Sequence, residues 1–248
     1  MFPFRDHNPS RHTPYVTILL IAMNIGVFLV QSTYASDPWL LARFYEGLAL
    51  RPADFTAGKG QLALVTYAFL HEGYLHLAGN MLFLWVFGDN LEDQLGHIRY
   101  AAFYLASAVG AVLVHVMSDP SSDIQVLGAS GAVAGVMGGY FLLFPKARID
   151  VFFFFIIFFR IIPIPAWIVL GVWFGAQIAN GVMSLPGGPG IAYWAHVGGF
   201  VIGLLLILPM WLRRGGRDYW RRIEGHPPHP ETKYKYSQSR IPMVRRRR

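Results

Sequence analysis

Three short segments of the chain carry side chains capable of chemistry within an otherwise apolar sequence. HEGYLHLAGN contains His71, His76 and Asn80, LGASGAVAG contains Ser130, and AHVGGFVIG contains His196. A serine hydroxyl within hydrogen-bond reach of an imidazole forms a nucleophile with its general base. Attack on a carbonyl creates an oxyanion, which needs N–H donors nearby. These residue types therefore predict Ser130 as a nucleophile and His196 as its base.

The first segment supplies the expected donors. His76 and Asn80 are four residues apart and share one helix face, whereas His71 lies about 140° further round, on a neighbouring face or just above the helix. We expect His76, Asn80 and the backbone amide of Ser130 to form an oxyanion hole. All 14 Asp and Glu residues lie outside the helices expected around Ser130 and His196. A carboxylate third member therefore has no obvious source, and the sequence implies a dyad.

A zinc site is the main alternative for the histidines of the first segment. His71-Glu72 resembles the start of an HExxH metalloprotease helix, in which two histidines four residues apart bind zinc. Here the second histidine, His76, comes one residue late, so the two imidazoles do not converge on one face. The sequence therefore predicts neither a metal site nor any cofactor.

The second segment combines a serine with closely spaced glycines. Gly131, Gly135 and Gly139 form a four-residue ladder that is typical of helices packing backbone to backbone. Helix packing alone could explain such a segment, with serine present only because it is small. It does not explain Ser130 between Gly128 and Gly131 at a helix start, where the hydroxyl is exposed and backbone N–H groups are free.

The third segment has a matching ladder. His196 is followed by Gly198, Gly199 and Gly203, which predicts a second helix able to approach a neighbour closely. An isolated histidine in a membrane helix can be a satisfied core residue or part of a proton path. Two glycine ladders, each with one catalytic-type side chain near the same end, favour instead a pairing of His196 with Ser130.

The composition sets the environment of these segments. Of 248 residues, 54% are hydrophobic and 14% are charged, whereas soluble domains average about 25% charged. This excludes a wholly soluble globule and favours a polytopic helical membrane protein. The chain has no cysteine, which excludes disulfides, thiolate metal sites and a cysteine nucleophile.

Six membrane spans are expected from the apolar segments. The Val151–Phe159 run is followed by Arg160, Pro163 and Pro165, so we interpret it as an interfacial or re-entrant piece. The first span is too long for the core of a cleaved signal peptide and is expected to be retained. The expected spans are 15–31, 74–88, 100–117, 126–144, 166–180 and 191–212.

The basic residues predict the orientation of these spans. With both termini inside, the inner regions hold six Lys and Arg before Leu212 and twelve after it, whereas the outer loops hold three. The positive-inside rule therefore puts both termini in the cytoplasm, and we expect a prokaryotic plasma membrane. Residues 32–73 form a long outer loop that we expect to lie in the membrane interface as short helices.

The three motifs, in this order on the second, fourth and sixth helices, closely resemble the rhomboid family of intramembrane serine proteases. The resemblance covers about residues 15–212. It implies Ser130 as nucleophile, His196 as base, His76 and Asn80 in the oxyanion hole, and His71 as an additional motif histidine. It also implies that the helix beginning PAWIVLGVWFGAQ acts as a lateral gate for substrate.

Two positions depart from the pattern of that family. A Trp-Arg pair is often found in the first outer loop of its members, but Gln61-Leu62-Ala63-Leu64 stands in the comparable stretch. Some members also stack an aromatic residue, one turn after the nucleophile, on the catalytic imidazole, and here that position is Ala134. How His196 is held is therefore left open by the sequence.

The predicted architecture is an all-α, six-helix, rhomboid-like transmembrane bundle over residues 15–212, with a cytoplasmic N-terminus over 1–14. Residues 213–248 are polar and basic and are expected to be a disordered cytoplasmic tail. We expect this tail to bind anionic lipid, with nucleic acid as the less favoured alternative. The expected partners are transmembrane protein substrates and the lipid bilayer.

Three other functions fit the sequence less well than a protease. A rhomboid-like pseudoprotease would usually lack Ser130 or His196, and both are present. A transporter or channel needs an ionisable pathway, for which the spans offer few acidic residues. An aspartyl intramembrane protease needs two facing Asp residues, whereas Asp89 has no partner among the spans.

Overall fold

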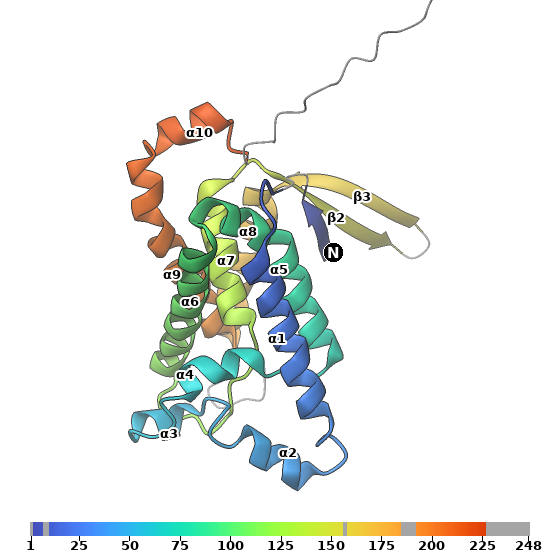
Figure 1. Ribbon diagram of the computed structural model, residues 1–248, viewed down its shortest axis with the longest axis vertical. Coiled ribbons are helices and arrows are strands. Elements are labelled where there is room, and N and C mark those ends of the chain that lie inside the picture. The colour runs from blue at the N-terminus through green and yellow to red at the C-terminus, as the bar shows by residue number, and fades with distance from the viewer. Residues whose placement is uncertain (1, 7–9, 156–157, 185–191, 227–248) are drawn as a thin grey trace, which may run out of the picture.

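The computed structural model describes residues 2–6, 10–155, 158–184 and 192–226, and shows a helical bundle with a small sheet at one end (Figure 1). A helix is present at each of the six expected positions. These helices are α1 (Tyr15–Ser32), α5 (Tyr74–Leu95), α6 (His97–Ser118), α7 (Ser130–Leu143), α8 (Ala166–Met183) and α9 (Tyr193–Arg213).

Four of these helices are long and apolar enough to cross a membrane within the described part of the chain, namely α1, α6, α8 and α9. The helix α5 has the length but carries Asp89, Glu92 and Asp93 in its last two turns. The helix α7 is apolar but only 14 residues long. The polytopic membrane architecture is therefore supported, whereas the count of six spans stays a prediction.

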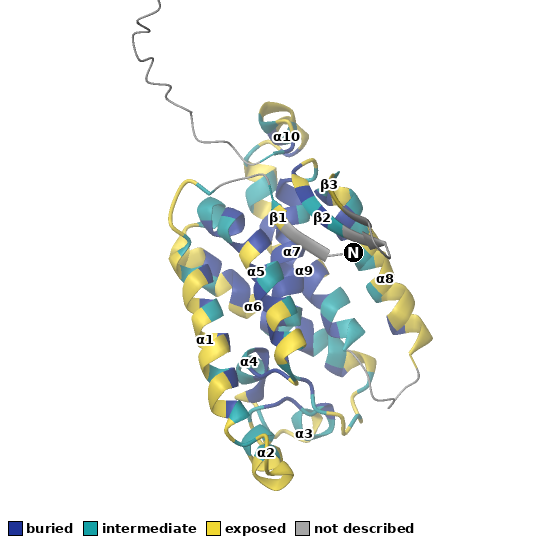
Figure 2. Cartoon of the chain, turned by 90° about the vertical axis from the view of Figure 1, so that its right-hand side faces the viewer, coloured by how far each residue is buried: buried dark blue, intermediate teal, exposed yellow. Residues whose placement is uncertain are grey.

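The centre of the bundle is α7, which Figure 2 shows among buried segments of α5, α6 and α9. Twelve of its 14 residues are buried, including every glycine. At 1.5 Å per residue its length is about 21 Å, shorter than a hydrocarbon core of about 30 Å. It begins at Ser130 and not at Val126 as expected, because Val126 pairs with Leu50 of the preceding loop in an isolated β-bridge.

The expected short helices are present between α1 and α5, at the end of the bundle opposite the sheet (Figure 1). They are α2 (Pro38–Tyr45), α3 (Pro52–Thr56), α4 (Ala63–Thr66) and the 3-10 turn η1 (Tyr67–Phe69). Buried Tyr67 ties this region to the bundle, because its hydroxyl donates to the carbonyl of Ala108 on α6 at 2.7 Å.

The expectation of an all-α fold, with Val151–Phe159 as an interfacial or re-entrant piece, is wrong at the other end of the bundle. The chain forms a three-stranded antiparallel sheet in the order β1 (Phe2–Asp6), β2 (Arg148–Phe155) and β3 (Phe158–Pro165). Register pairs run from Arg148↔Pro165 to Phe155↔Phe158. The prolines stand at the end of β3, where a missing ladder hydrogen bond is tolerated.

The expectation of a disordered tail from residue 213 is also wrong for its first part. The helix α10 (Arg217–Ile223) folds back against the bundle. The Trp220 indole packs on Trp211 with ring centroids 4.9 Å apart, and its N–H donates to the carbonyl of Leu142 at 2.8 Å. These aromatic side chains bury apolar surface and so favour folding, although the composition of the segment as a whole is basic and polar. Residues 227–248, the rest of the predicted tail, lie outside the described residues.

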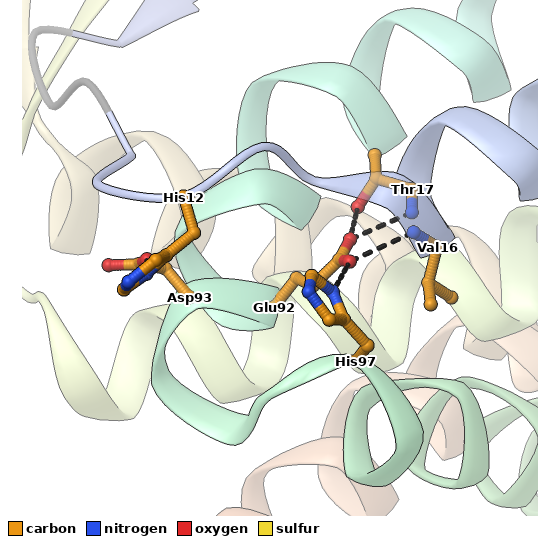
Figure 3. Close-up of polar contacts among 6 residues, drawn as sticks. All are labelled: His12, Val16, Thr17, Glu92, Asp93 and His97. Atoms are coloured by element: carbon orange, nitrogen blue, oxygen red, sulfur yellow. Dashed lines mark hydrogen bonds and ion pairs between the residues drawn. The ribbon is translucent and has the colours of Figure 1, made fainter.

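The start of α1 is capped by a carboxylate from another helix (Figure 3). The backbone N–H groups of Val16 and Thr17 each donate to Glu92 at 2.8 Å, and the Thr17 hydroxyl donates at 2.7 Å. The Glu92 side chain is 1% exposed and also contacts His97 at 2.5 Å. First-turn N–H groups have no partner within their own helix, so Glu92 satisfies two of them and fixes α1 against α5.

Candidate active site

Ser130 and His196 lie side by side at the start of two packed helices. The His196 Nε2 atom is 2.8 Å from the Ser130 Oγ atom. Ser130 is the first residue of α7 and His196 is the fourth residue of α9. Sixty-six positions apart in the sequence, these two residues have the geometry of a nucleophile and its general base.

Glycine contacts between α7 and α9 allow this approach. A Cβ atom at Gly199 would overlap the carbonyl oxygen of Gly131, and one at Gly203 would overlap that of Gly135. A Cβ at Gly198 would collide with Val114 of α6. The two ladders predicted from the sequence therefore lie directly against one another.

A side chain at the glycine positions of α7 would also meet close neighbours. A Cβ at Gly131 would lie 2.8 Å from the Ala111 Cβ atom, and one at Gly135 would overlap Ser107. A Cβ at Gly139 would lie 3.0 Å from Ile207 of α9. Glycines thus form the contact of α7 with α6 as well as with α9.

His196 is held on its other side by residues that the sequence interpretation missed. The Gln177 Oε1 atom on α8 lies 2.8 Å from His196 Nδ1. The Trp173 ring, one turn earlier on α8, lies 5.9 Å from the imidazole between ring centroids, at 36°. An amide within the apolar span 166–180 is itself a signal of function. That signal could have drawn attention to Gln177, but the spacing along α8 alone does not reveal its partner.

The oxyanion-hole candidates lie around Ser130. His76 and Asn80 line the same cavity as Ser130 and His196. The Asn80 side-chain nitrogen is buried and has no hydrogen-bond partner among the described residues. A Cβ at Gly128 would lie 2.7 Å from His76 Nε2, and Gly128 has φ +128°, which only glycine adopts readily. Gly128 therefore allows the His76 ring to pack against the backbone two residues before Ser130.

His71 lies behind the cavity and not in its lining. Its side chain is fully buried, and its ring packs edge-on against His76 with centroids 5.1 Å apart. The His71 backbone N–H donates to Gln31 Oε1 of α1 at 3.2 Å, and the Gln31 amide donates in return to the His71 carbonyl. Burial, with a further contribution from His76, lowers the pKa of His71 to about 4. The ring is therefore neutral and supports His76 through packing.

The cavity over these residues has a volume of about 730 Å³. Ser130, His196, His76 and Asn80 line it together with apolar side chains, among them Phe83, Met137 and Trp173. Glu72, Gln125 and Tyr67 also line it. A mainly apolar wall with a few polar groups is typical of binding pockets. Among the described residues, no group of three or more His, Asp or Glu side chains is arranged to hold a metal ion.

Comparison with known proteins adds to this geometry. Residues 59–213 match the Rhomboid domain. Over 204 residues the chain is 30% identical to "Rhomboid protein 1, mitochondrial" of Saccharomyces cerevisiae, covering 78% of this chain and 53% of that protein. It is 28% identical to "RHOMBOID-like protein 12, mitochondrial" of Arabidopsis thaliana over 208 residues, covering 77% and 56% of the two chains. It is 29% identical to "Rhomboid-related protein 2" of Mus musculus over 132 residues, covering 52% and 42%.

The chain thus spans about half the length of these curated relatives. Two of these relatives are named as mitochondrial proteins, so the comparisons do not support the expectation of a prokaryotic plasma membrane. The matched domain covers more than half of the 248 residues and includes all three motifs. The chain is therefore an integral membrane protein that belongs to the rhomboid family.

Proposed function

We propose that this chain is an intramembrane serine endopeptidase that hydrolyses peptide bonds in or near the transmembrane segments of membrane-protein substrates. The observation that carries the proposal is the 2.8 Å contact between Ser130 Oγ and His196 Nε2. The membership of the chain in the rhomboid family supports the same reaction class.

Acylation begins with attack of Ser130 Oγ on the scissile carbonyl carbon, while His196 Nε2 takes the hydroxyl proton. The resulting oxyanion accepts hydrogen bonds from the Ser130 backbone N–H, the Asn80 amide and the His76 ring. Collapse of the tetrahedral intermediate breaks the C–N bond, and His196 returns its proton to the leaving amine. An ester between Ser130 and the new carboxyl end of the substrate remains.

Deacylation repeats these steps with water as the nucleophile. His196 takes a proton from water, and the hydroxide formed attacks the ester carbonyl. The proton then returns to Ser130 Oγ as the product acid leaves. Water must therefore reach Ser130, and a cavity lined by imidazole, amide and hydroxyl groups at the start of α7 suits this need.

We further propose that both termini lie in the cytoplasm and that the cavity opens to the opposite side. The basic residues favour this topology, and β1 and α10 lie at the same end of the bundle (Figure 1). Substrates would then be cut near the outer ends of their transmembrane segments.

The topology can be tested with single cysteines. A cysteine at Gln125, in the cavity wall, should react with an impermeant thiol reagent added outside intact cells, whereas one at exposed Lys146 should not. The reverse pattern would contradict the topology.

We also propose that the chain has three parts. These are a cytoplasmic N-terminus (1–14), a protease core (15–212) and a basic tail (213–248) that binds anionic lipid. The prokaryotic plasma membrane likewise stays a prediction, which fractionation of the native cells would test. Binding of the isolated chain to vesicles with and without anionic lipid, before and after removal of residues 227–248, would test the role of the tail.

A serine-directed fluorophosphonate probe tests the enzymatic proposal. The probe forms a covalent bond only with an activated serine hydroxyl. We expect it to label the purified protein in detergent, with the adduct on Ser130, and labelling to be lost in Ser130→Ala. A folded wild-type protein that resists labelling and cleaves no transmembrane substrate would contradict the proposal and favour a client-binding pseudoprotease.

A further inference from the structure

The contact between Gln177 and His196 bears on which imidazole nitrogen carries the proton. The Gln177 Oε1 atom, 2.8 Å from His196 Nδ1, has lone pairs only and can act solely as an acceptor. With the amide oxygen on this side, a neutral His196 that makes this hydrogen bond carries its proton on Nδ1. The Nε2 atom, 2.8 Å from Ser130 Oγ, keeps the lone pair that a general base needs.

Among the described residues, no carboxylate forms a hydrogen bond with His196 Nδ1 in place of Gln177. The hydrogen-bond partners of His196 among them are Gln177 on Nδ1 and Ser130 on Nε2. In serine proteases with an Asp–His pair, the buried Asp holds the imidazole in the correct tautomer and orientation. An amide oxygen can perform the first of these tasks, although it adds no full negative charge.

The same helix also packs on the imidazole ring. Trp173 lies 5.9 Å from His196 between ring centroids, whereas the position one turn after the nucleophile is the small Ala134. Trp173 and Gln177 are four residues apart and so share one face of α8. The ring of His196 thus has its aromatic neighbour and its hydrogen-bond acceptor on one helix.

Contacts on either side of Gln177 hold that face of α8 against α9. Phe174 stacks on Phe200 with centroids 4.4 Å apart at 22°. At the other end, a Cβ at Gly181 would lie 3.3 Å from the Trp194 ring, so the two helices are close there as well. Elsewhere α8 is sparsely packed, since only four of its 18 residues are buried. Its outer surface is largely exposed (Figure 2).

We infer that Gln177 is a positioning residue that fixes the catalytic tautomer of His196, so that the base is ready only while α8 lies against α9. The inference rests on the proposed function, because it assigns Gln177 a task in the same Ser130/His196 reaction. It also makes the tautomer of His196 depend on the position of α8, a helix at the edge of the bundle.

Steady-state cleavage of a transmembrane substrate in proteoliposomes tests the kinetic part. Gln177→Met keeps the length of the side chain but removes the acceptor, and should lower kcat about 10- to 100-fold with little change in KM. Gln177→Glu restores an acceptor and should recover most of that loss. The matched control is Asn180→Leu, which removes an exposed amide from the same helix and should leave both constants unchanged. A wild-type kcat in Gln177→Met would overturn the inference.

Nitrogen-15 NMR of histidine-labelled protein in detergent tests the tautomer without any substrate. The His196 resonances are assigned by their loss in His196→Ala. We expect a protonated Nδ1 in the wild type and a larger share of protonated Nε2 in Gln177→Met. Protonated Nε2 in the wild type, or an unchanged tautomer in Gln177→Met, would overturn the inference. If the wild type cuts no substrate, the protease proposal fails, and this spectrum still decides the assignment of Gln177.

Discussion

Gly199 of α9 lies so close to the carbonyl oxygen of Gly131 of α7 that no Cβ atom fits between them. Gly131 directly follows Ser130, and Gly199 is three residues after His196. This contact therefore sets the separation of the two helices beside the reacting atoms. The 2.8 Å distance between Ser130 Oγ and His196 Nε2 depends on it.

Gly199→Ala should increase that separation and slow catalysis. Overpacking of a well-packed interface costs about 1–3 kcal/mol of folding free energy. A displacement of about 1 Å at a reacting group can cost about 100-fold in rate. We expect kcat to fall by about that factor. The control is Gly175→Ala on α8, where an added Cβ meets no atom within 4 Å. Equal activity of the two variants would show that the glycine contact does not position the site.

Asn80→Ala should slow cleavage and leave the nucleophile intact. The Asn80 amide nitrogen has no partner among the described residues, so its hydrogen bond is available to the oxyanion. Loss of one such donor costs about 10²–10³ in kcat, and His76→Ala should have an effect of similar size. Substrate titrations of both variants should show the loss in kcat and not in KM. An unchanged kcat in both would place the oxyanion elsewhere.

The helices of the bundle from α1 to α9 could be predicted because their apolar segments and helix starts follow local patterns, whereas α10 could not. Pro165 predicts a helix start at Ala166, and α8 begins there. By contrast, the apolar run from Val151 does not reveal whether it is a strand or another buried segment, since short runs of this kind are ambiguous. Its pairing with Phe2–Asp6 joins positions about 145 apart in sequence, which no local pattern encodes.

The candidate catalytic residues could be predicted from the sequence, but the residues that hold them in place could not. Ser130, His196, His76 and Asn80 stand out as polar side chains within apolar segments. Gln177 and Gln31 are polar residues of the same kind, but their roles arise from contacts with other helices. Only the packed structure determines such contacts.

Glu92→Leu should destabilise the bundle more than a change at the neighbouring Asp93. Removal of the carboxylate leaves the N–H groups of Val16 and Thr17 without their partner (Figure 3). We expect a loss of about 2–4 kcal/mol in the free energy of unfolding.

The matched control is Asp93→Asn. Asp93 pairs with His12 at 2.6 Å, and the two side chains are 8% and 74% exposed, respectively. Asn at this position keeps an oxygen that accepts a hydrogen bond, so the substitution should cost about 1 kcal/mol or less. Denaturation in mixed detergent micelles measures both variants. A smaller effect at Glu92 than at Asp93 would contradict the role of Glu92 as a cap.

Acid should destabilise the protein partly through His71. Its pKa is about 4 in the folded protein and about 6.5 in an unfolded chain, so the unfolded state binds more protons between these values. Stability from this group is therefore fully present above about pH 6.5 and is lost as the pH falls toward 4, by up to about 3 kcal/mol.

His71→Phe keeps a buried ring of similar size and removes this titration. We expect the melting temperature of this variant in detergent to fall less than that of the wild type between pH 7 and pH 4.5. The other histidines are common to both proteins, so the difference between the two curves isolates His71. Parallel curves would show that His71 does not titrate in this range.

Ser130 and His196 act as one catalytic unit in the proposed mechanism. Cleavage kinetics of Ser130→Ala, His196→Ala and the double variant in proteoliposomes test whether they do. Residues that act as a unit are strongly non-additive. We predict that each single variant stays folded and loses about 10⁴-fold or more in kcat, and that the double variant is no slower than either one. Turnover near the wild-type rate in either single variant, or losses that multiply in the double variant, would contradict the claim.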